Sequence, residues 1–266
     1  MKAPAKLRWL YALSILFICL FGVQLAILAT RSIKYGGLQC MIAAGVAIGA
    51  FAGYTVIRTA WRAVAQAYST RKWQKRFRAN LHAKLTKRMA YRYRELGTKI
   101  LVVRDDAFVA LAIGMRKPVI VLSDTVIDRF DEEEVRAIVL HEWHHCRNRD
   151  NAKLFFARLL TEAFGYFPMM RPIFRYYQTW AELLADRFAI RRMGTEVPLA
   201  GVLLKLSKLG GERRRAAAVH FAATTLDYRI AQVLEPEKTV KVKVAVLRPL
   251  LASVSLLLLF MLGGDA

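Results

Sequence analysis

The segment that decides the fold reads DEEEVRAIVLHEWHHCRNRD and spans residues 131–150. Asp131 is placed to cap a helix, a glutamate three residues later completes a capping box, and the apolar residues that follow recur with helical spacing. On this predicted helix His141 and His145 are one turn apart, so both imidazoles can bind one metal ion. Glu142 lies beside them and can accept a proton from an attacking water, as in the HExxH arrangement. The alternative is a surface helix that happens to carry two histidines.

A catalytic zinc site with an open fourth position needs a third protein ligand. Residues 180–187, WAELLADR, place Glu182 and Asp186 one turn apart on a predicted helix that ends near Gly194. Glu182 is the candidate third ligand, and Asp186 is the candidate acceptor for the outer N–H of a ligand histidine. Asp150 is a further candidate acceptor. The alternative for Glu182 is an ordinary surface charge, and that for Asp150 is a helix-end charge among arginines. The alternative for Asp186 is a pair with Arg187, Arg191 or Arg192.

Short runs of β-type residues precede the motif, at 100–104, 107–113 and 119–123. A turn beginning at Gly114 separates the last two runs, so we expect a small antiparallel sheet. One strand should expose an edge on which an extended peptide pairs through main-chain hydrogen bonds. After the sheet the pattern is helical to about Leu234.

Three apolar segments predict transmembrane helices. Residues 9–29 and 35–57 carry no charge, and each is long enough to cross about 30 Å of hydrocarbon. Residues 249–264 form a shorter segment, which a helical extension from Val244 would lengthen. A cleaved signal peptide is the alternative for the first segment. Small residues in the second segment predict close packing of the first two helices as a hairpin: Gly45, Gly49 and Gly53.

The formal net charge of +22 requires an anionic neighbour, either nucleic acid or the inner face of a bilayer. Residues 58–99 contain thirteen Lys/Arg and one acid, whereas the connector between the first two spans contains two basic residues. This asymmetry predicts that the amino terminus and residues 58–243 face the cytoplasm. Because the basic segment directly follows a span, we expect anionic lipid, and not nucleic acid, as its partner. Aromatic residues at near-helical spacing support a helix along the headgroups: Trp61, Tyr68, Trp73 and Phe77.

Two further features limit the class of protein. The three cysteines have no paired spacing, which excludes a secreted disulfide scaffold.

Residues 152–172 are apolar but carry four charges, and a membrane crossing there would place Glu182 on the opposite side from the two histidines. We therefore expect this segment to pack under the first two spans or to dip into the leaflet.

The motifs together resemble the membrane metallopeptidases of the BlaR/MecR antirepressor type and, more distantly, those of the HtpX/Ste24 type. The resemblance covers about residues 100–235 and rests on these patterns: Val139-Leu140-His141-Glu142-x-x-His145, Arg149-Asp150, Glu182-x-x-Ala185-Asp186-Arg187 and Leu199-Ala200-Gly201-x-Leu203-Leu204-Lys205-Leu206.

The resemblance implies a gluzincin-like zinc peptidase minidomain on the inner membrane face. In it, His141, His145 and Glu182 are zinc ligands and Glu142 is the catalytic base. A cytoplasmic repressor is the implied substrate. Because the sequence ends at Ala266, we expect the extracellular penicillin-binding sensor of the β-lactam receptors to be absent.

Related peptidases supply an oxyanion-stabilising group from the region after the glutamate helix, where His220, Tyr228 and Arg229 lie. We assign this role to His220, with a structural histidine as the alternative. Tyr228 is expected to pack. His144 points off the metal side of its helix and is expected to be exposed, and Cys146 is expected to be an ordinary thiol.

The sequence thus predicts an α-helical integral membrane protein with a cytoplasmic α+β gluzincin-like zinc peptidase minidomain. Its function would be Zn²⁺-dependent cleavage of a protein substrate, such as a transcriptional repressor. The alternatives are a quality-control peptidase for membrane proteins and a non-enzymatic basic scaffold with a structural metal. The predicted domains are a transmembrane hairpin, a basic amphipathic juxtamembrane helix, the peptidase domain and a final span, at residues 1–57, 58–99, 100–243 and 244–266.

Overall fold

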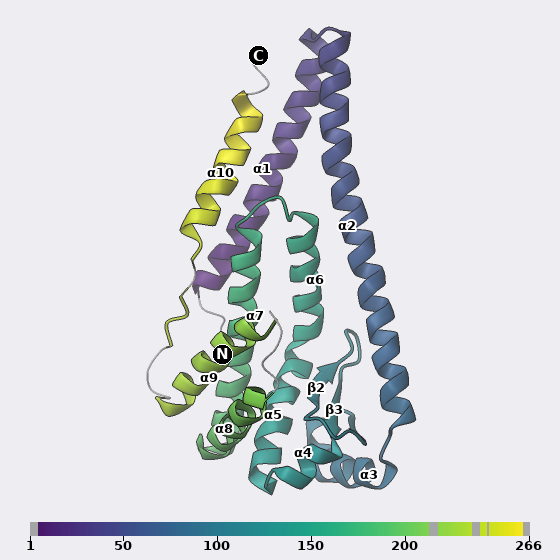
Figure 1. The fold of residues 1–266 in the computed structure, drawn as a ribbon, viewed down its shortest axis with the longest axis vertical. Helices are drawn as coiled ribbons and strands as arrows, with labels where there is room; N and C mark the ends of the chain where they lie inside the picture. Colours follow the sequence, from purple (N-terminus) through teal and green to yellow (C-terminus); the bar gives the residue numbers. More distant parts are fainter. Residues whose placement is uncertain (1–4, 213–217, 236–239, 244, 263–266) are drawn as a thin grey trace. The chain divides into compact units, whose positions relative to one another are not determined.

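The computed structural model describes residues 5–212, 218–235, 240–243 and 245–262, without the side chains of 6–7, 209–212, 218–224 and 260–262. The chain divides into two compact units. We call the first the helical unit; it comprises Lys2–Ala67, Phe156–Tyr177 and Lys243–Ala266. We call the second the site unit; it comprises Tyr68–Phe155 and Gln178–Val242. Figure 1 shows the helices and strands of each.

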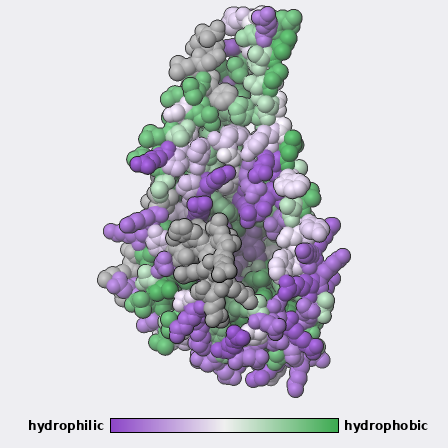
Figure 2. Space-filling model, in the orientation of Figure 1, coloured by the Kyte–Doolittle hydropathy of each residue, from purple (hydrophilic) through white to green (hydrophobic). Residues whose placement is uncertain are grey.

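The helical unit contains two helices that are long and apolar enough to cross a membrane. They lie in α1 (Ala5–Tyr35) and α2 (Leu38–Ala79), and α10 (Leu247–Leu262) holds a shorter apolar stretch. Figure 2 shows hydrophobic surface along these helices. Helix α10 begins at Leu247, so the expected extension from Val244 is wrong for residues 245–246. Pro249 explains the late start, because proline is tolerated in the first turn of a helix and not in its interior.

Aromatic rings, and not glycines, join α1 to α2. Phe21 of α1 lies 5.3 Å from Phe51 of α2 between ring centroids, and both rings contact Tyr166. Tyr166 lies in the turn between α6 (Asp150–Ala163) and α7 (Met170–Met193), so the segment 152–172 packs against the first two helices, as expected. An added Cβ on Gly45, Gly49 or Gly53 would meet no atom within 4 Å. The expectation of close packing through these glycines is therefore wrong.

The site unit contains a mixed three-stranded sheet. Strands β1 (Ile100–Val103), β2 (Ala110–Ile113) and β3 (Val119–Ser123) lie in the order β1-β3-β2. Strands β2 and β3 are antiparallel, whereas β1 and β3 are parallel, so the expectation of an antiparallel sheet is wrong for β1. The turn at Gly114, with φ of 105°, fixes only the β2–β3 hairpin. The position of β1 depends on residues 104–109, which connect β1 at one edge of the sheet to β2 at the other edge.

The sheet is covered on both faces. Its inner face packs on α5 (Glu132–Asn148) in the main core, which contains Ile100, Val102, Ile120, Leu122, Val135, Ile138 and Val139. The other face packs on Phe77 from the end of α2, through Val103 and Val121. Phe77 was expected among lipid headgroups, but it is 3% exposed and belongs to this small core.

Residues 58–99 form the end of one helix and two further helices, and not a single juxtamembrane helix. Helix α2 ends at Ala79, α3 spans Ala83–Arg92 and the 3-10 helix η1 spans Arg94–Leu96. His82 caps α3 by accepting a hydrogen bond from the backbone N–H of Leu85. Leu81 bridges to Val103 of β1, which interrupts the helical path.

The remaining helices of the site unit pack around α5. They are α4 (Asp124–Arg129), α8 (Val197–Glu212) and α9 (Ala218–Leu234). Glu134 of α5 contacts Lys205 of α8, and an added Cβ on Gly201 would lie 2.5 Å from the Glu134 carboxylate. Glycine at position 201 therefore allows α8 to approach the start of α5 closely. Helix α7 ends at Met193, before Gly194 with its φ of 76°, as predicted.

Candidate metal centre

Helix α5 presents the two histidines and the glutamate of the motif to one side of the site unit. The helix begins at the predicted capping box, in which Asp131 accepts from the backbone of Glu134 and the Glu134 carboxylate accepts from the backbone of Asp131. This box fixes the first turn, and the apolar face packs on the sheet. His141, Glu142 and His145 are all buried, at 6%, 9% and 8% exposure. A surface helix with two incidental histidines does not fit this burial.

Glu182 of α7 meets the two histidines and completes a group of three candidate metal ligands. The two Nε2 atoms lie 3.2 Å apart, and the Glu182 carboxylate lies 3.4 Å from His141 Nε2 and 3.5 Å from His145 Nε2. Ligands at about 2.0–2.2 Å from one zinc in tetrahedral geometry are themselves separated by about 3.3–3.6 Å. The three separations therefore fit a zinc-sized ion with little movement.

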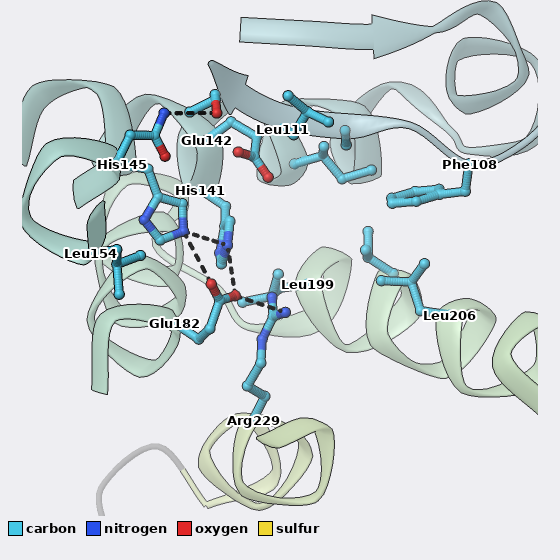
Figure 3. A pocket seen from close by; sticks show the side chains of 15 residues that line it. Phe108, Leu111, His141, Glu142, His145, Leu154, Glu182, Leu199, Leu206 and Arg229 are labelled. Carbon is cyan, nitrogen blue, oxygen red and sulfur yellow. Dashed lines mark hydrogen bonds and ion pairs between the residues drawn. The ribbon is translucent and has the colours of Figure 1, made fainter. Parts of the chain in front are cut away.

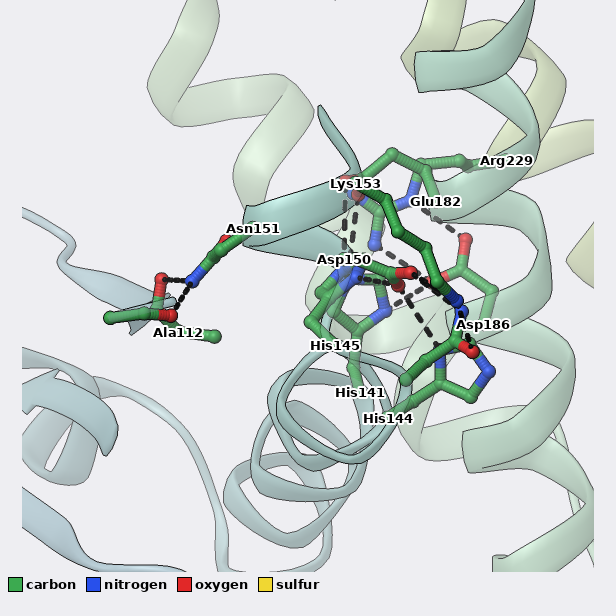
Figure 4. A network of polar contacts seen from close by, with 12 residues as sticks. Ala112, His141, His144, His145, Asp150, Asn151, Lys153, Glu182, Asp186 and Arg229 are labelled. Carbon is green, nitrogen blue, oxygen red and sulfur yellow. Dashed lines mark hydrogen bonds and ion pairs between the residues drawn. The ribbon is translucent and has the colours of Figure 1, made fainter. Parts of the chain in front are cut away.

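The outer nitrogen of each histidine contacts a buried aspartate, as Figure 4 shows. His145 Nδ1 lies 2.9 Å from Asp150, and His141 Nδ1 lies 2.8 Å from Asp186. Both carboxylates are almost completely buried. A carboxylate in this position fixes the tautomer that leaves Nε2 free for a metal and orients the ring. This role was predicted from the sequence for both aspartates, and in the structure each aspartate lies beside one of the two histidines.

The junction between α5 and α6 places Asp150 beside His145. Arg149 adopts the left-handed conformation, with φ of 54° and ψ of 40°, and ends α5. Helix α6 then begins at Asp150 itself. The abrupt change of direction turns the Asp150 carboxylate back toward the preceding helical turn, where His145 lies.

Arg229 of α9 lies in the region expected to supply an oxyanion-stabilising group, but its contact with the acids of the metal centre was not predicted. Its guanidinium makes two hydrogen bonds to Asp186, at 2.7 and 2.8 Å, and lies 3.2 Å from Glu182. The sequence suggested Arg187, Arg191 or Arg192 as alternative partners of Asp186. The observed partner comes instead from a helix 43 residues further along the chain.

The charges of the centre favour ionised carboxylates. Burial alone would favour the neutral acids, but the charges on Arg229 and His141 overcome this and hold the pKa values of Glu182 and Asp186 below their usual range. Burial also opposes the charge on Arg229, but the same two acids raise its pKa above the usual value. For His141, burial and Arg229 favour the neutral ring, but Asp186 and Glu182 raise its pKa to about 10.

The formal charge balance of the centre fits a divalent cation. Four carboxylates surround the two imidazoles: Glu142, Asp150, Glu182 and Asp186. Among the described residues, the cations opposing them are the buried Arg229 and the half-exposed Lys153, which lies 4.0 Å from Asp150. With neutral histidines, two negative charges remain in excess. A divalent metal would neutralise this excess and take the place of the proton on His141.

A cavity of about 310 Å³ opens beside the three candidate ligands, His141, His145 and Glu182, as Figure 3 shows. Its polar lining contains His141, Glu142, His145, Glu182 and Arg229. Its apolar lining comes from β2 and its flank, from α5 and α6 and from α8: Phe108, Leu111, Ile138, Leu154, Leu199, Val202 and Leu206. Glu142 thus shares a cavity with the metal group, as a catalytic base requires.

Three neighbouring predictions have different outcomes. His144 was expected to be exposed but is half-buried, with its ring centroid 5.2 Å from that of Phe188, and burial lowers its pKa to about 4. His144, His145 and Asp150 form a second group of possible ligands, but His145 already belongs to the first group and Asp150 contacts its outer nitrogen.

Cys146 is buried, which raises its pKa to about 12 and makes it inert, as expected. The side chain of His220 lies outside the described residues.

The buried HExxH helix, the downstream glutamate and the carboxylate-supported histidines define a metallopeptidase. A family model described as BlaR1 peptidase M56 matches residues 24–233, and the chain belongs to this family. It is also similar to two proteins described as "Protease HtpX homolog", from Bacteroides fragilis strains YCH46 and ATCC 25285, at 28% and 26% identity over 91 residues. Each alignment covers 34% of this chain and 28% of the relative, so the chain spans less than a third of their length.

Proposed function

We propose that the protein is a zinc endopeptidase that acts at the cytoplasmic face of the membrane. The observation that carries this proposal is the triangle of His141, His145 and Glu182, whose separations suit one tetrahedral ion with a free fourth position. Two imidazoles and one carboxylate are a donor set typical of catalytic zinc. When bound, zinc supplies Lewis-acid chemistry: it lowers the pKa of water towards about 7 and polarises a carbonyl group.

Glu142 carries the proton in this proposal. Its carboxylate lines the cavity beside the ligand group and accepts a proton from the attacking water, whose oxygen bonds to the scissile carbonyl carbon. The same proton then passes to the amide nitrogen as the C–N bond breaks, so the amine leaves neutral. His220, which lies on the same helix as Arg229, is assigned the oxyanion-stabilising role.

Strand β2 offers the edge on which an extended substrate pairs. The backbone N–H of Ser123, on β3, donates to the carbonyl oxygen of Val109, at 2.7 Å, and the backbone N–H of Val109 donates to the Ser123 hydroxyl, at 3.1 Å. Because paired positions alternate along an antiparallel ladder, the main chains of Ala110 and Ala112 face away from β3. Asn151 donates a hydrogen bond to the carbonyl oxygen of Ala112, at 2.8 Å, which leaves Ala110 at the cavity as the pairing position.

The membrane placement follows the charge asymmetry of the sequence. We assign residues 1–57 to a transmembrane hairpin, 58–99 to a basic membrane-surface segment, 100–243 to the cytoplasmic peptidase domain and 244–266 to a final span. The two candidate spans support this assignment. A substrate that meets the site from the cytoplasm, such as a repressor, fits this arrangement.

Cysteine labelling tests the topology in a background without the native cysteines. Ala90 is exposed on α3, and Tyr35 lies 78% exposed at the connector between α1 and α2. An impermeant thiol reagent added outside intact cells should label Tyr35→Cys and leave Ala90→Cys unlabelled. Labelling of the second variant from outside would contradict the cytoplasmic placement.

The Glu142→Gln variant tests the catalytic proposal. It removes the proton acceptor but none of the proposed ligands, so bound zinc should stay at the wild-type level while peptide hydrolysis falls by at least about 100-fold. Glu133→Gln is the matched control, because Glu133 is an exposed acid of the same helix. Full activity in Glu142→Gln would sink the assignment, whereas a scaffold with a structural metal would bind zinc and hydrolyse no peptide even as the wild type.

A further inference from the structure

A second charged cluster lies in the helical unit, where three arginines surround one carboxylate. We call it the arginine cluster: Arg58, Arg62, Arg158 and Glu162. Arg158 Nε donates a hydrogen bond to Glu162, at 3.2 Å. The nitrogens of Arg62 and Arg58 lie 3.4 and 3.8 Å from the same carboxylate. These longer distances are ion-pair contacts without good hydrogen-bond geometry.

The cluster has more positive charge than its surroundings neutralise. Among the described residues of the helical unit, Glu162 is the one acid. Three guanidinium groups and one carboxylate leave two positive charges in excess, and Arg58 and Arg158 both repel Arg62. The Nε atoms of Arg58 and Arg62 are buried and, within the described residues, make no hydrogen bond. Because buried charged donors without acceptors are costly, the cluster calls for an additional anion.

An aromatic cavity lies next to the cluster along the same helices. Its volume is about 300 Å³, and its lining consists of Ala50, Phe51, Tyr54, Gly165 and Tyr166. Tyr54 precedes Arg58 by four residues on α2, which places the ring and the guanidinium on one helical face about 6 Å apart along the axis. On the other side of the cavity, Tyr166 follows Glu162 by four residues.

Gly165 keeps this cavity open. A Cβ added at this position would lie 3.1 Å from the hydroxyl oxygen of Tyr54 and 3.3 Å from a backbone oxygen of α6. The two aromatic walls approach each other, with the Tyr54 and Tyr166 centroids 5.8 Å apart. An apolar cavity thus lies one helical turn from a group of cations, and this combination matches the two chemical halves of a phospholipid.

We propose that the aromatic cavity and the arginine cluster bind one anionic phospholipid. Its phosphate contacts the arginines, and part of its glycerol and acyl region lies against the rings of the cavity. Arginine suits this role, because its planar fork donates paired hydrogen bonds to phosphate oxygens. The site rests on the membrane placement proposed above, in which Arg58 follows the second span at the inner surface. A singly charged anionic headgroup neutralises one of the two excess charges, whereas the choline of a zwitterionic lipid would add a cation.

Spin-labelled lipids in vesicles test this site in the full chain. The protein is reconstituted in phosphatidylcholine vesicles, and electron paramagnetic resonance measures how much labelled phosphatidylglycerol or labelled phosphatidylcholine is immobilised. We expect one phosphatidylglycerol to bind about tenfold more strongly than phosphatidylcholine. Arg62→Gln should remove this preference. The control Arg71→Gln changes a cation of the same helix outside the cluster and should retain it.

Two further variants separate a lipid site from a structural ion pair. Glu162→Gln removes the competing internal carboxylate and should strengthen phosphatidylglycerol binding severalfold, whereas a purely structural pair would give no gain. Ala50→Phe fills the cavity without changing charge and should weaken binding. Equal immobilisation of the two lipids by the wild type, or an unchanged preference in Arg62→Gln, would overturn the proposal.

Zinc content, measured on the same samples, keeps this proposal separate from the peptidase proposal. If the wild type shows no lipid preference but retains zinc, only the lipid-site proposal is wrong, and the peptidase proposal is unaffected. If the chain fails to enter phosphatidylcholine vesicles while it retains zinc, both the lipid site and the membrane placement fall, and the metal centre does not.

Discussion

The metal centre and the arginine cluster have opposite charge imbalances within one strongly basic chain. Within the part of the chain that the structure describes, four carboxylates oppose two cations in the metal centre, and three cations oppose one carboxylate in the arginine cluster. The net charge of +22 predicts neither imbalance. Salt and water screen the exposed charges spread over the rest of the chain, whereas neighbouring charges in a partly buried site interact strongly, so the local excess decides which ligand fits. One site suits a divalent cation, and the other suits a phosphate.

The two sites also differ in burial. The aspartates of the metal centre are 0% and 1% exposed and already contact their histidines. In the arginine cluster, the side chains of Arg58 and Arg158 are 42% and 49% exposed. We therefore expect substitutions in the metal centre to have large effects on stability and on ligand binding, and substitutions in the cluster to affect mainly lipid binding.

The largest effect is expected for His141→Ala. Two remaining ligands cannot hold the ion, so zinc should fall from one per chain to none detectable in metal analysis of the purified protein. His144→Ala is the control, because it removes a neighbouring histidine whose ring packs on Phe188. Full zinc occupancy in His141→Ala would remove this residue from the ligand set.

Arg229→Ala should cost most in folding stability. It leaves Asp186 buried without its guanidinium partner, and removing one member of a buried ion pair costs about 3–5 kcal/mol. Arg229→Lys should recover only part of this, because an ammonium group cannot reproduce the two parallel hydrogen bonds. Chemical denaturation of the full chain in detergent measures the loss. The exposed Arg191→Ala serves as the control, and equal stability of the two alanine variants would contradict this prediction.

Asp186→Asn should weaken zinc binding about 10- to 100-fold, because the amide no longer fixes the His141 tautomer. This is a smaller defect than that of Glu182→Ala. Competition with a chelator measures the affinity, and Asp128→Asn on α4 provides an exposed-aspartate control. If the zinc affinity of Asp186→Asn equals that of the control, the Asp186 carboxylate only neutralises the charge of Arg229 and does not position His141.

The smallest effect is expected for Arg158→Gln in detergent without lipid. Arg158 and Glu162 form a half-exposed pair four residues apart on α6, and such pairs contribute about 0.3–0.5 kcal/mol. Thermal unfolding should therefore hardly change. A destabilisation as large as that of Arg229→Ala would show that the arginine cluster is a structural network and would remove the contrast between the two sites.

Local sequence patterns predicted much of the metal centre. The capping box, the spacing of His141 and His145, and the pair Glu182 and Asp186 all follow from helical periodicity within one element. The end of α7 at Gly194 was also predicted from the residue type. Such features depend on residues three or four positions apart, so the sequence alone contains the information.

Features that depend on distant residues were not predicted. Arg229 reaches Asp186 from another helix, and no local signal connects them. The parallel pairing of β1 with β3 depends on the path of residues 104–109, whereas the hairpin turn was visible in the sequence. The glycines of α2 showed that helices can pack closely there, but the contact with α1 formed through aromatic rings.

X-ray absorption at the zinc edge of the purified full chain tests the central claim most directly. We expect one zinc per chain, with nitrogen and oxygen ligands at about 2.0–2.2 Å and outer scattering from two imidazoles. The signal of one oxygen ligand should change in Glu182→Gln. A sulfur ligand at about 2.3 Å, which would implicate a cysteine such as Cys146, or the absence of bound zinc would contradict the assignment of His141, His145 and Glu182.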